Sequence, residues 1–531
     1  HHEGELAFAD ILLKSATVNP DYTAIPGLSV RVEGTRTFKT AAGGRIKDLR
    51  QLRSPYLDGV FDFLLDGKFD LNVSQETNRG CMYKCTFCDW GGNVMDKFHT
   101  MGEDRLLEEF EWFGRNKVEF LFNCDANYGL GRNDVELTRQ MIKIRERHDG
   151  FPRKFRMCTA KNSDEKIFEI VKMLNDAGMN KGATLSRQSM YGPTLDAIER
   201  RNIKMEKFGS LMKSYADAGI ATYTELIMGM PAETYESSKA GVDELLEGQE
   251  KALNLFVFIC SMLPNSKMST PEYMAKHGIK KVRVPLLLAH STPDPSSIAE
   301  YQDVAVETNS MSKEDWQRTY LFYWAVQAFH CLGLLQHVAI LFHKRYGLRY
   351  SDFYERLVEY FGAEPATRVG KEIAMVKAAV AEMMAGGRID RVLPQFGDIY
   401  WPLEEASSLT LVANKAQFYA EVRAFIGALA NTLNCGEEDT LLDDLVLYQS
   451  SMLKGPDDIE RLIDFRYDLH GFFGRLQEPE ARLDTVPSRL RVKPEKLFGG
   501  NLAEWAQEVV WYGRKGGSLH HRQVEAERLA V

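Results

Sequence analysis

Cysteine is scarce in this sequence, which has eight cysteines among 531 residues. Three of them, Cys81, Cys85 and Cys88, lie within eight residues, and the other five are scattered. A disulfide framework requires a denser set of cysteines in a much shorter chain. The number and spacing of the cysteines exclude a small protein stabilised by disulfides. They indicate a metal site plus buried thiols in a reducing compartment, so we expect a cytoplasmic protein.

Long apolar runs and an excess of basic residues are also absent. The sequence contains no run of about 18 or more apolar residues, the length that a helix needs to cross a membrane. No signal-peptide pattern opens the chain. The net charge of -9 provides no basic surface for wrapping nucleic acid. The sequence therefore predicts neither a membrane nor a nucleic-acid partner, and 44% hydrophobic with 27% charged residues is typical of a globular protein.

The length of the chain exceeds what one hydrophobic core usually supports, so we expect more than one domain. Residues 1–66 contain short apolar pieces broken by proline and glycine, which predict a lead-in segment. Residues 67–280 alternate between β-rich and amphipathic helical stretches and form the predicted core domain. Residues 281–531 carry successive apolar stripes at helical spacing, which predict a mostly helical C-terminal domain.

The predicted core domain consists of β/α units in sequence. The expected strands are 71–77, 118–123, 154–159, 181–186, 221–228 and 254–260, and the expected helices are 103–114, 133–147, 164–177, 205–217 and 235–249. Repeated β/α units imply parallel strands joined by right-handed crossovers. The expected fold class is therefore α/β, either a partial (β/α)6 TIM-like barrel or an open doubly wound sheet, followed by a helical C-terminal region.

The three clustered cysteines come directly after the first predicted strand, in the segment ETNRGCMYKCTFCDWGG. Their C-x3-C-x2-C spacing offers three thiolates, whereas iron-sulfur clusters are commonly held by four. A cubane held by three cysteines keeps one iron open, as catalytic metals keep an open position. Such an iron can coordinate the amino and carboxylate groups of S-adenosylmethionine, and the cluster can pass an electron into the sulfonium.

Two other interpretations of these cysteines stay open. Spacings of four and three residues also place side chains on one face of a helix, where cysteines can be small core residues. The flanking Gly80 and Gly91-Gly92 favour a loop that wraps a ligand instead. A zinc site with His99 as the fourth ligand is the other alternative, although structural zinc ligands more often come as two separated pairs.

The segment GCMYKCTFC, with the aromatic Phe87 just before its third cysteine, resembles the signature of radical S-adenosylmethionine enzymes. The resemblance implies a six-unit partial barrel, a 4Fe-4S cluster, S-adenosylmethionine as cosubstrate and its reductive cleavage to a 5'-deoxyadenosyl radical. It also implies an electron donor such as flavodoxin or ferredoxin. The resemblance extends to the later segments NCDANYG, TAKN, TLSRQSM, AIERRNI, ELIMGMPAET and MLPNS.

Together with EGELAFADIL, IPGLSVR and SPYLDGVFD in the lead-in, these segments resemble a narrower group, which is normally preceded by a cobalamin-binding module and often methylates unactivated carbon. The resemblance covers residues 3–280 and is loose beyond them. The module's D-x-H-x-x-G motif has one near match, at Asp468–Gly474, but its glycine stands one residue late. Cobalamin is then expected on a separate cobalamin-binding polypeptide, on a removed domain, or not at all.

Polar residues at the ends of the predicted strands are candidate cosubstrate ligands, because a barrel gathers its chemistry there. Asp125 and Asn127 suit the amino-acid part or the ribose, although both residue types also form turns. Lys161 suits the carboxylate, although lysines are usually solvated. By resemblance, Ser186 and Gln188 line the pocket. The full cofactor-binding prediction is Phe87, Asp125, Asn127, Thr159, Lys161, Asn162, Ser186, Gln188 and Gly229, the last letting backbone approach the adenine.

Three further residues are candidates for acid, base or substrate contacts. Glu225 lies within the fifth predicted strand, where a buried carboxylate must be paired or functional. His290 and His330 are expected at the barrel exit and in the helical region, where either could act as an acid or base. A lone histidine on an apolar helix face is more often a satisfied core residue, and that interpretation stands beside the catalytic one.

The sequence supports three functional hypotheses. The first is a radical S-adenosylmethionine methyltransferase, linked to cobalamin and acting on an unactivated carbon of a small molecule or natural-product intermediate. The second is cobalamin-independent 5'-deoxyadenosyl-radical chemistry such as epimerisation, cyclisation or dehydrogenation, motivated by the missing cobalamin motif. The third is a non-catalytic metal-binding subunit that associates with another protein through its helical half.

Overall fold

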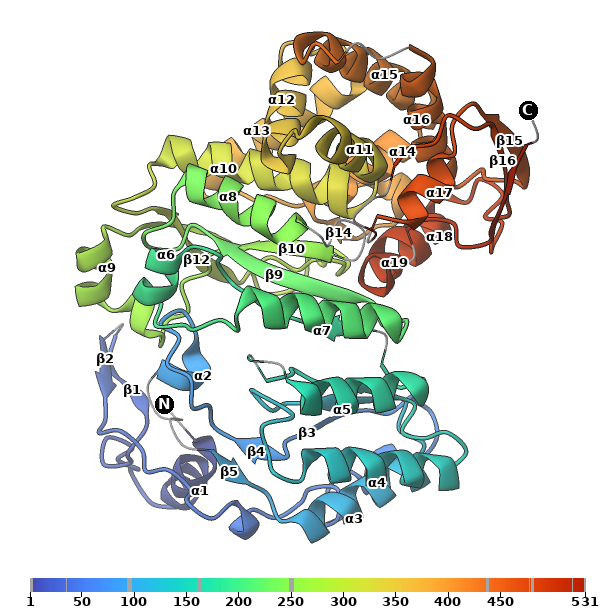
Figure 1. Ribbon diagram of the computed structural model, residues 1–531. Helices are drawn as coiled ribbons and strands as arrows, with labels where there is room; N and C mark the ends of the chain where they lie inside the picture. Colours follow the sequence, from blue (N-terminus) through green and yellow to red (C-terminus); the bar gives the residue numbers. More distant parts are fainter. Residues whose placement is uncertain are drawn as a thin grey trace. The chain divides into compact units, whose positions relative to one another are not determined.

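The computed structural model describes residues 3–34, 36–92, 98–160, 162, 164–180, 182–247, 253–435, 439–476, 478, 482–517 and 519–529 (Figure 1). The chain divides into two compact units. The first unit comprises His1–Ala160 and Asp176–Asn180, and the second comprises Lys161–Asn175 and Lys181–Val531.

The first unit is built around a parallel three-stranded sheet in the order β3-β6-β7. Asn72 pairs with Phe120, and Phe120 pairs in turn with Lys154. Helices α3 and α4 connect the strands and pack against each other, with Phe110 and Phe113 of α3 fully buried. The elements are α1 (Gly4–Ser15), β1 (Ser29–Glu33), β2 (Arg36–Lys39), β3 (Asn72–Gln75), β4 (Asn78–Arg79), α2 (Asp89–Gly92), β5 (His99–Thr100), α3 (Glu103–Arg115), β6 (Phe120–Asn123), α4 (Asp134–Arg147) and β7 (Lys154–Arg156).

The second unit begins with another parallel three-stranded sheet, in the order β10-β9-β8. Alternate residues of β9 are buried and half-buried, so one face of this strand packs into the unit's core and the other stays partly open. The elements of this part are α5 (Glu165–Asp176), β8 (Ala183–Thr184), α6 (Gly192–Ala197), α7 (Met205–Asp217), β9 (Thr222–Met228), α8 (Tyr235–Leu246), β10 (Leu253–Ile259), α9 (Pro271–His277), β11 (Lys280–Pro285) and β12 (Tyr301–Glu307).

The rest of the second unit is a helical bundle closed by an antiparallel sheet, β15-β16-β17 (Figure 1). The bundle core holds large aromatic side chains with almost no exposure, among them Trp316, Trp324 and Trp401. Its elements are α10 (Lys313–Ala325), η4 (Val326–Cys331), α11 (Gln336–Tyr346), α12 (Tyr350–Gly362), α13 (Arg368–Met384), β13 (Arg391–Val392), β14 (Tyr400–Trp401), α14 (Leu403–Val412), α15 (Lys415–Thr432), α16 (Asp439–Met452), β15 (Arg461–Phe465), α17 (Leu469–Gly474), β16 (Ser488–Val492), α18 (Leu502–Trp505), η6 (Ala506–Trp511), α19 (Tyr512–Gly516) and β17 (Val524–Arg528).

The prediction of an α/β fold with parallel strands is confirmed. All six expected strands are present within a few residues of their predicted bounds, and five helices follow the predicted alternation. The prediction of a mostly helical region after residue 281 is incomplete, because it omitted the hairpin of β11 with β12 and the sheet β15-β16-β17. These strands are short or carry alternating charged residues, which weakened their signal.

Among the described residues, no single helix is long and apolar enough to span a membrane. One bent pair, Lys313–Cys331 with Gln336–Tyr346, reaches that length and composition together. Nearly every residue from Phe322 to Phe342 is buried within the second unit. A core position therefore accounts for the apolar character of this pair.

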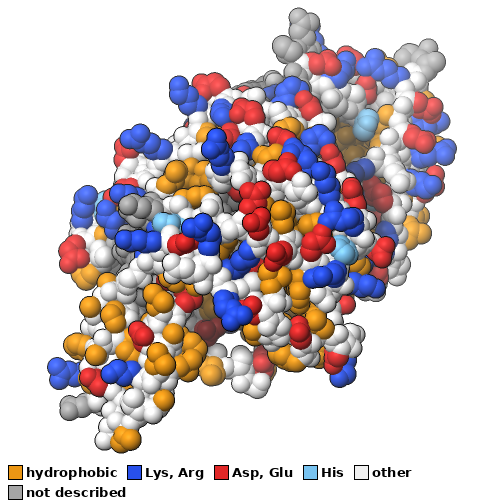
Figure 2. Space-filling view, turned by 90° about the horizontal axis from the view of Figure 1, so that it is seen from below, with side chains coloured by type: hydrophobic (Ala, Val, Ile, Leu, Met, Phe, Trp, Pro, Cys, Tyr) orange, Lys and Arg blue, Asp and Glu red, His pale blue; other side chains and the backbone are white. Residues whose placement is uncertain are grey.

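The first unit exposes an unusual share of large apolar side chains. Helix α1 has no buried residue, and its Leu6, Phe8, Leu12 and Leu13 are 56 to 72% exposed. Of all large apolar side chains that are exposed in the described part of the chain, about half belong to the first 90 residues. Figure 2 shows hydrophobic side chains gathered toward one edge of the face that it displays.

Candidate active site

The three clustered cysteines lie in an irregular loop of the first unit, between β4 and α2. Gly80 opens this loop with a φ of 113°, a conformation that residues with a Cβ rarely adopt. Cys81 and Cys85 are buried and Cys88 is half-buried, and the backbone N–H of Cys88 donates to the carbonyl of Cys85 at 3.1 Å. The chain thus presents these thiols from a loop rather than from one helix face.

Asp125, which follows β6, fixes the segment that leads into the cysteine loop. One carboxylate oxygen accepts the backbone N–H of Thr77 at 2.7 Å and that of Asn78 at 3.1 Å. The other accepts the Thr77 hydroxyl and the Asn78 amide. Burial raises the pKa of Asp125 to about 6, against the lowering effect of these donors. Asp125 therefore has a positioning role that the sequence did not reveal.

Asn127 lies beside the first cysteine. Its Nδ2 donates to Sγ of Cys81 at 3.1 Å, and both side chains are fully buried. The next residue, Tyr128, donates its backbone N–H to the carbonyl of Cys158 at 2.8 Å and forms a parallel bridge with Thr159. The structure thus brings Asn127 into contact with the cysteine loop and places Thr159 on the neighbouring chain segment.

The three thiols of this loop have the chemistry of ligands that hold iron-sulfur clusters. Among the described residues, no group of three His, Cys, Asp or Glu side chains could hold one metal ion. No disulfide forms among the eight cysteines, all of which are described. Three thiols in one loop, with an amide donor on the first, suit an iron-sulfur cluster.

Three more residues were predicted to bind the cofactor in this region, namely Phe87, Lys161 and Asn162. Phe87 is half-buried next to Cys88, in the loop itself. Lys161 lies outside the described residues. Asn162 is half-buried, and its Oδ1 has no hydrogen-bond partner among the described residues. An unpartnered buried carbonyl oxygen is costly, which makes Asn162 a plausible acceptor for a bound ligand.

A second group of predicted residues meets on the sheet of the second unit. Ser186 Oγ donates to Oε2 of Glu225 at 2.5 Å. The backbone N–H of Gln188 donates to the carbonyl of Glu225 at 2.8 Å, and Gln188 has a φ of 65°. Glu225 is half-buried on the partly open face of β9. Ser186, Gln188 and Glu225 therefore form one polar cluster where β8 continues alongside β9.

Gly229 and Glu233, at the carboxyl end of β9, form a tight buried turn. Gly229 has a φ of 82°, and a Cβ there would lie 2.9 Å from Nε1 of Trp316. Its backbone N–H donates to Oε2 of Glu233 at 3.0 Å. Burial raises the pKa of Glu233 to about 8. Glu233 is not among the residues predicted from the sequence, although a carboxylate directly after a strand was an available signal.

Replacing Glu233 by glutamine is expected to remove a pH dependence of stability. The folded-state pKa of about 8 lies above the ordinary 4.5, so the stability from the protonated carboxyl is complete below pH 4.5 and is lost as pH rises through 8. Burial also raises the pKa of Cys260 and Tyr323 nearby, which keeps both neutral in this range. Glu233 alone should account for a loss of about 2 kcal/mol of unfolding free energy between pH 6 and pH 8.

Urea unfolding at several pH values measures this loss. The Glu233→Gln profile should fall by about 2 kcal/mol less than that of wild type over this range, and Glu236→Gln, an exposed neighbour in the first turn of α8, should follow wild type. Parallel profiles for wild type and Glu233→Gln would rule out the assignment.

The two predicted histidines both have partners. His330 is fully buried, and its Nδ1 lies 2.8 Å from the Tyr354 hydroxyl. His290 has a φ of 64°, and its Nε2 lies 2.6 Å from Oε2 of Glu405. Its ring stacks on Trp511 at a centroid distance of 4.7 Å. These contacts support a structural role for both histidines, and their catalytic role stays a prediction.

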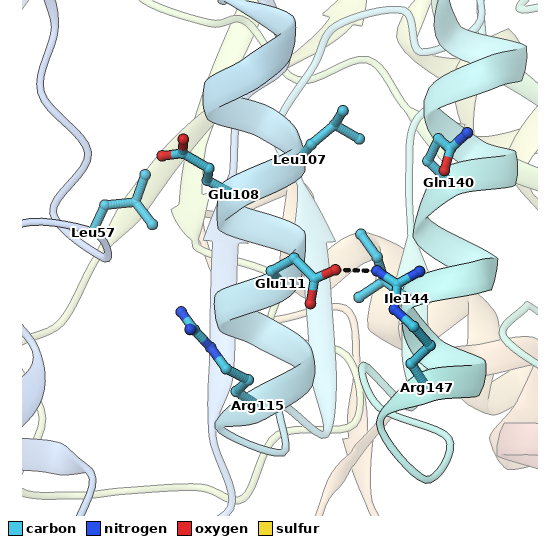
Figure 3. Close-up of a pocket in the computed structure, with 8 residues that line it drawn as sticks. All are labelled: Leu57, Leu107, Glu108, Glu111, Arg115, Gln140, Ile144 and Arg147. Carbon is cyan, nitrogen blue, oxygen red and sulfur yellow. Dashed lines mark hydrogen bonds and ion pairs between the residues drawn. The ribbon is translucent and has the colours of Figure 1, made fainter.

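One cavity of about 500 Å³ lies in the first unit. It is lined by side chains of α3 and α4 together with Leu57. Figure 3 shows Glu111 of α3 directed toward Arg147 of α4, with which it forms an ion pair. No predicted site residue lines this cavity, so it is not part of the candidate site.

Parallel β/α units with a three-cysteine loop after the first strand are the features of a radical S-adenosylmethionine enzyme. No model of a known protein family matches the chain. Among curated proteins, it is 34% identical over 529 residues to 2-(S-pantetheinyl)-carbapenam-3-carboxylate methyltransferase of Streptantibioticus cattleyicolor. It is 33% identical over 524 residues to the cobalamin-dependent radical SAM methyltransferase TokK of Streptomyces tokunonensis.

Each alignment covers 94% of this chain and 75% of the relative. The chain therefore belongs to the family of cobalamin-dependent radical S-adenosylmethionine methyltransferases, and it is an enzyme. A solved structure of the methyltransferase TsrM from Kitasatospora setae is also similar, with 16% identity and a TM-score of 0.42 over 60% of this chain and 64% of that one. The resemblance seen in the cysteine loop and lead-in is confirmed at the level of the family.

Proposed function

We propose that this enzyme transfers a methyl group from S-adenosylmethionine to an unactivated carbon of a small molecule or natural-product intermediate, with a 4Fe-4S cluster and cobalamin as cofactors. The observation that carries the proposal is the three-cysteine loop in a chain that shares a third of its residues with two named methyltransferases. One of these relatives is named for a pantetheinyl carbapenam carboxylate, so a carboxylate of that kind is the first substrate to test.

The cysteine loop would hold the cluster, which when bound supplies the electron for breaking the sulfonium. Cys81, Cys85 and Cys88 would each bind one iron, and Asp125 would keep the start of their loop in place through Thr77 and Asn78. These contacts would hold the start of the cysteine loop in one position before any ligand binds. Such preorganisation is what lets a site act without rearrangement during the reaction.

The cosubstrate would contact residues at the strand ends. Phe87, Asn127, Thr159, Lys161, Asn162, Ser186, Gln188 and Gly229 are the proposed set. The half-buried Glu225 carboxylate, held by Ser186, would orient a cationic or hydroxyl group. His290 and His330 remain candidates for moving a proton at the substrate.

The finer architecture also belongs to this proposal. We infer a partial (β/α)6 barrel across residues 67–280, with the lead-in before it and the helical domain after it. The exposed apolar side chains of α1 suit coverage by a cobalamin-binding module, whether on a separate polypeptide or on the same one. An electron donor such as flavodoxin or ferredoxin would reduce the cluster, and a reducing cytoplasm would keep the thiols available.

The test is an anaerobic assay of the reconstituted enzyme with S-adenosylmethionine, the carbapenam carboxylate and a reductant, with and without cobalamin. We expect S-adenosylhomocysteine and a methylated product by mass spectrometry, both at least tenfold higher with cobalamin. 5'-Deoxyadenosine without methylated product, independent of cobalamin, would favour epimerisation, cyclisation or dehydrogenation instead. A protein that contains zinc but no iron or sulfide would favour the hypothesis of a non-catalytic metal-binding subunit. Membership in an enzyme family argues against that hypothesis.

A further inference from the structure

We propose that Asn127 sets the reduction potential of the cluster by donating a hydrogen bond to the sulfur of Cys81. The inference rests on the proposed function, because it takes Cys81 as a cluster ligand. Asn127 is then a tuning residue that acts through Cys81 and need not touch the substrate.

The contact between the two residues is short and fully enclosed. Nδ2 of Asn127 lies 3.1 Å from Sγ of Cys81, and neither side chain is exposed. A thiolate can only accept hydrogen bonds, so an amide oxygen in place of the nitrogen would repel it. The amide orientation with nitrogen toward sulfur is therefore the one that cluster binding would select.

Both partners of the contact are held by the same strand end. Asp125, two residues before Asn127, binds Thr77 and Asn78 ahead of Cys81. Tyr128, directly after Asn127, is tied by its backbone to Cys158 on the next segment. These contacts hold the chain on either side of the donor and ahead of the sulfur, so the amide and the sulfur stay within reach of each other.

A donor held against a ligand sulfur shifts the redox balance in one direction. The reduced cluster carries one more negative charge, part of which resides on its sulfurs, so an N–H donor stabilises the reduced form more than the oxidised form. The low dielectric of a buried site strengthens this preference. Asn127 should therefore raise the potential of the cluster and make its reduction by an electron donor easier.

The second polar atom of Asn127 agrees with this arrangement. Its Oδ1 is buried and has no hydrogen-bond partner among the described residues. The amide is thus oriented by the sulfur and not by a partner at its oxygen. The free acceptor is available to a donor on the cosubstrate, in keeping with the role proposed above.

The experiment compares Asn127→Leu with Asn123→Leu. Asn123 is equally buried at the end of β6, and its Oδ1 accepts the backbone N–H of Asp125 at 3.3 Å. The control is therefore the same substitution at a matched depth, at a residue whose recorded contact is with Asp125. Asn127→Ala, which removes the donor without adding bulk, serves as a second variant should leucine prevent folding. Each protein is reconstituted with iron and sulfide under anaerobic conditions, without cosubstrate.

Iron and sulfide content and the midpoint potential from a spectroelectrochemical titration are the readouts. Asn127→Leu and Asn127→Ala should keep wild-type iron and sulfide but hold about tenfold less reduced cluster at a fixed potential, a shift of about 59 mV to more negative values. Asn123→Leu should titrate like wild type.

The inference would be overturned if both Asn127 variants kept the wild-type midpoint potential, or if Asn123→Leu shifted that potential equally. Either result would leave the proposed function unaffected. A wild-type protein that takes up no iron and sulfide would overturn both the inference and the proposed function.

Discussion

Replacing Cys81, Cys85 or Cys88 singly by alanine is expected to abolish cluster binding and reduce methyl transfer below detection. Each thiolate of a three-cysteine cubane holds a different iron, so the loss of one leaves a second open corner and no defined anchor. Cys81 and Cys85 are buried, and alanine fits their space, so folding should survive. Iron and sulfide analysis, the absorption spectrum of the reconstituted protein and the methyl-transfer assay measure the effect.

Cys124→Ala is the matched control for these variants. Cys124 also lies in the first unit, is half-buried, and follows β6 as the cysteine loop follows β4. Its replacement should leave iron content and activity near wild type. Retention of full iron-sulfur absorption in any of the three loop variants, with a wild-type circular dichroism spectrum, would show that the cluster ligands lie elsewhere.

The parallel strands could be predicted because their signal is local. Strand β9 alternates strictly between a packed and an open face, and α3 buries Leu106, Phe110 and Phe113 at helical spacing. The cysteine loop was equally visible, since its three cysteines stand within eight residues and its glycines flank them. Features of this kind depend on a few neighbouring residues, which is why the predicted and observed strand positions agree within a few residues.

The contacts that organise the site could not be predicted, because they join residues far apart in the chain. Asp125 binds Thr77 across 48 residues, and Asn127 meets Cys81 across 46. From the sequence, both looked equally like turn formers or cosubstrate ligands. Only the parallel register of β3 with β6 brings their segments together, and no local pattern specifies which donor then faces which acceptor.

The C-terminal sheet was missed for a related reason. Strand β16 pairs with β15 and β17, and its buried Ser488, Leu490 and Val492 alternate with the half-buried Arg489 and the exposed Arg491, so its apolar positions are few. Its partners are separated from it by longer segments that contain α17 on one side and α18 to α19 on the other, rather than by a tight turn, so no hairpin signal marks them. The last turns of the chain, around Arg514, gave no sequence indication of their importance.

Arg514 is the centre of a buried charge network in the second unit. Its side chain is 1% exposed, and Nη1 donates to Glu404 at 2.8 Å and to Glu405 at 2.9 Å. Nη2 donates to Gln327 at 3.1 Å, and the guanidinium lies over the ring of Phe256. Burial alone would lower the pKa of Arg514, but the two carboxylates outweigh it and raise that pKa. The network joins α19 to α14 and to β10.

Arg514→Met is therefore expected to destabilise the protein by about 3 to 5 kcal/mol, because it leaves two buried carboxylates without their cation. Arg522→Met, an exposed arginine whose Nη2 donates to Gly517 at 2.8 Å, should change stability by no more than about 0.5 kcal/mol. Urea unfolding followed by circular dichroism measures both.

The cost of Arg514→Met should fall when the stranded charges are removed as well. Glu404→Gln and Glu405→Gln, combined with Arg514→Met, replace the buried charges by neutral amides, and a buried ion group exchanged as a whole is often close to neutral in stability. His290 would still contact the residue at 405, so part of the loss should persist. A triple variant no more stable than Arg514→Met would show that packing against Phe256, rather than charge compensation, is what Arg514 contributes.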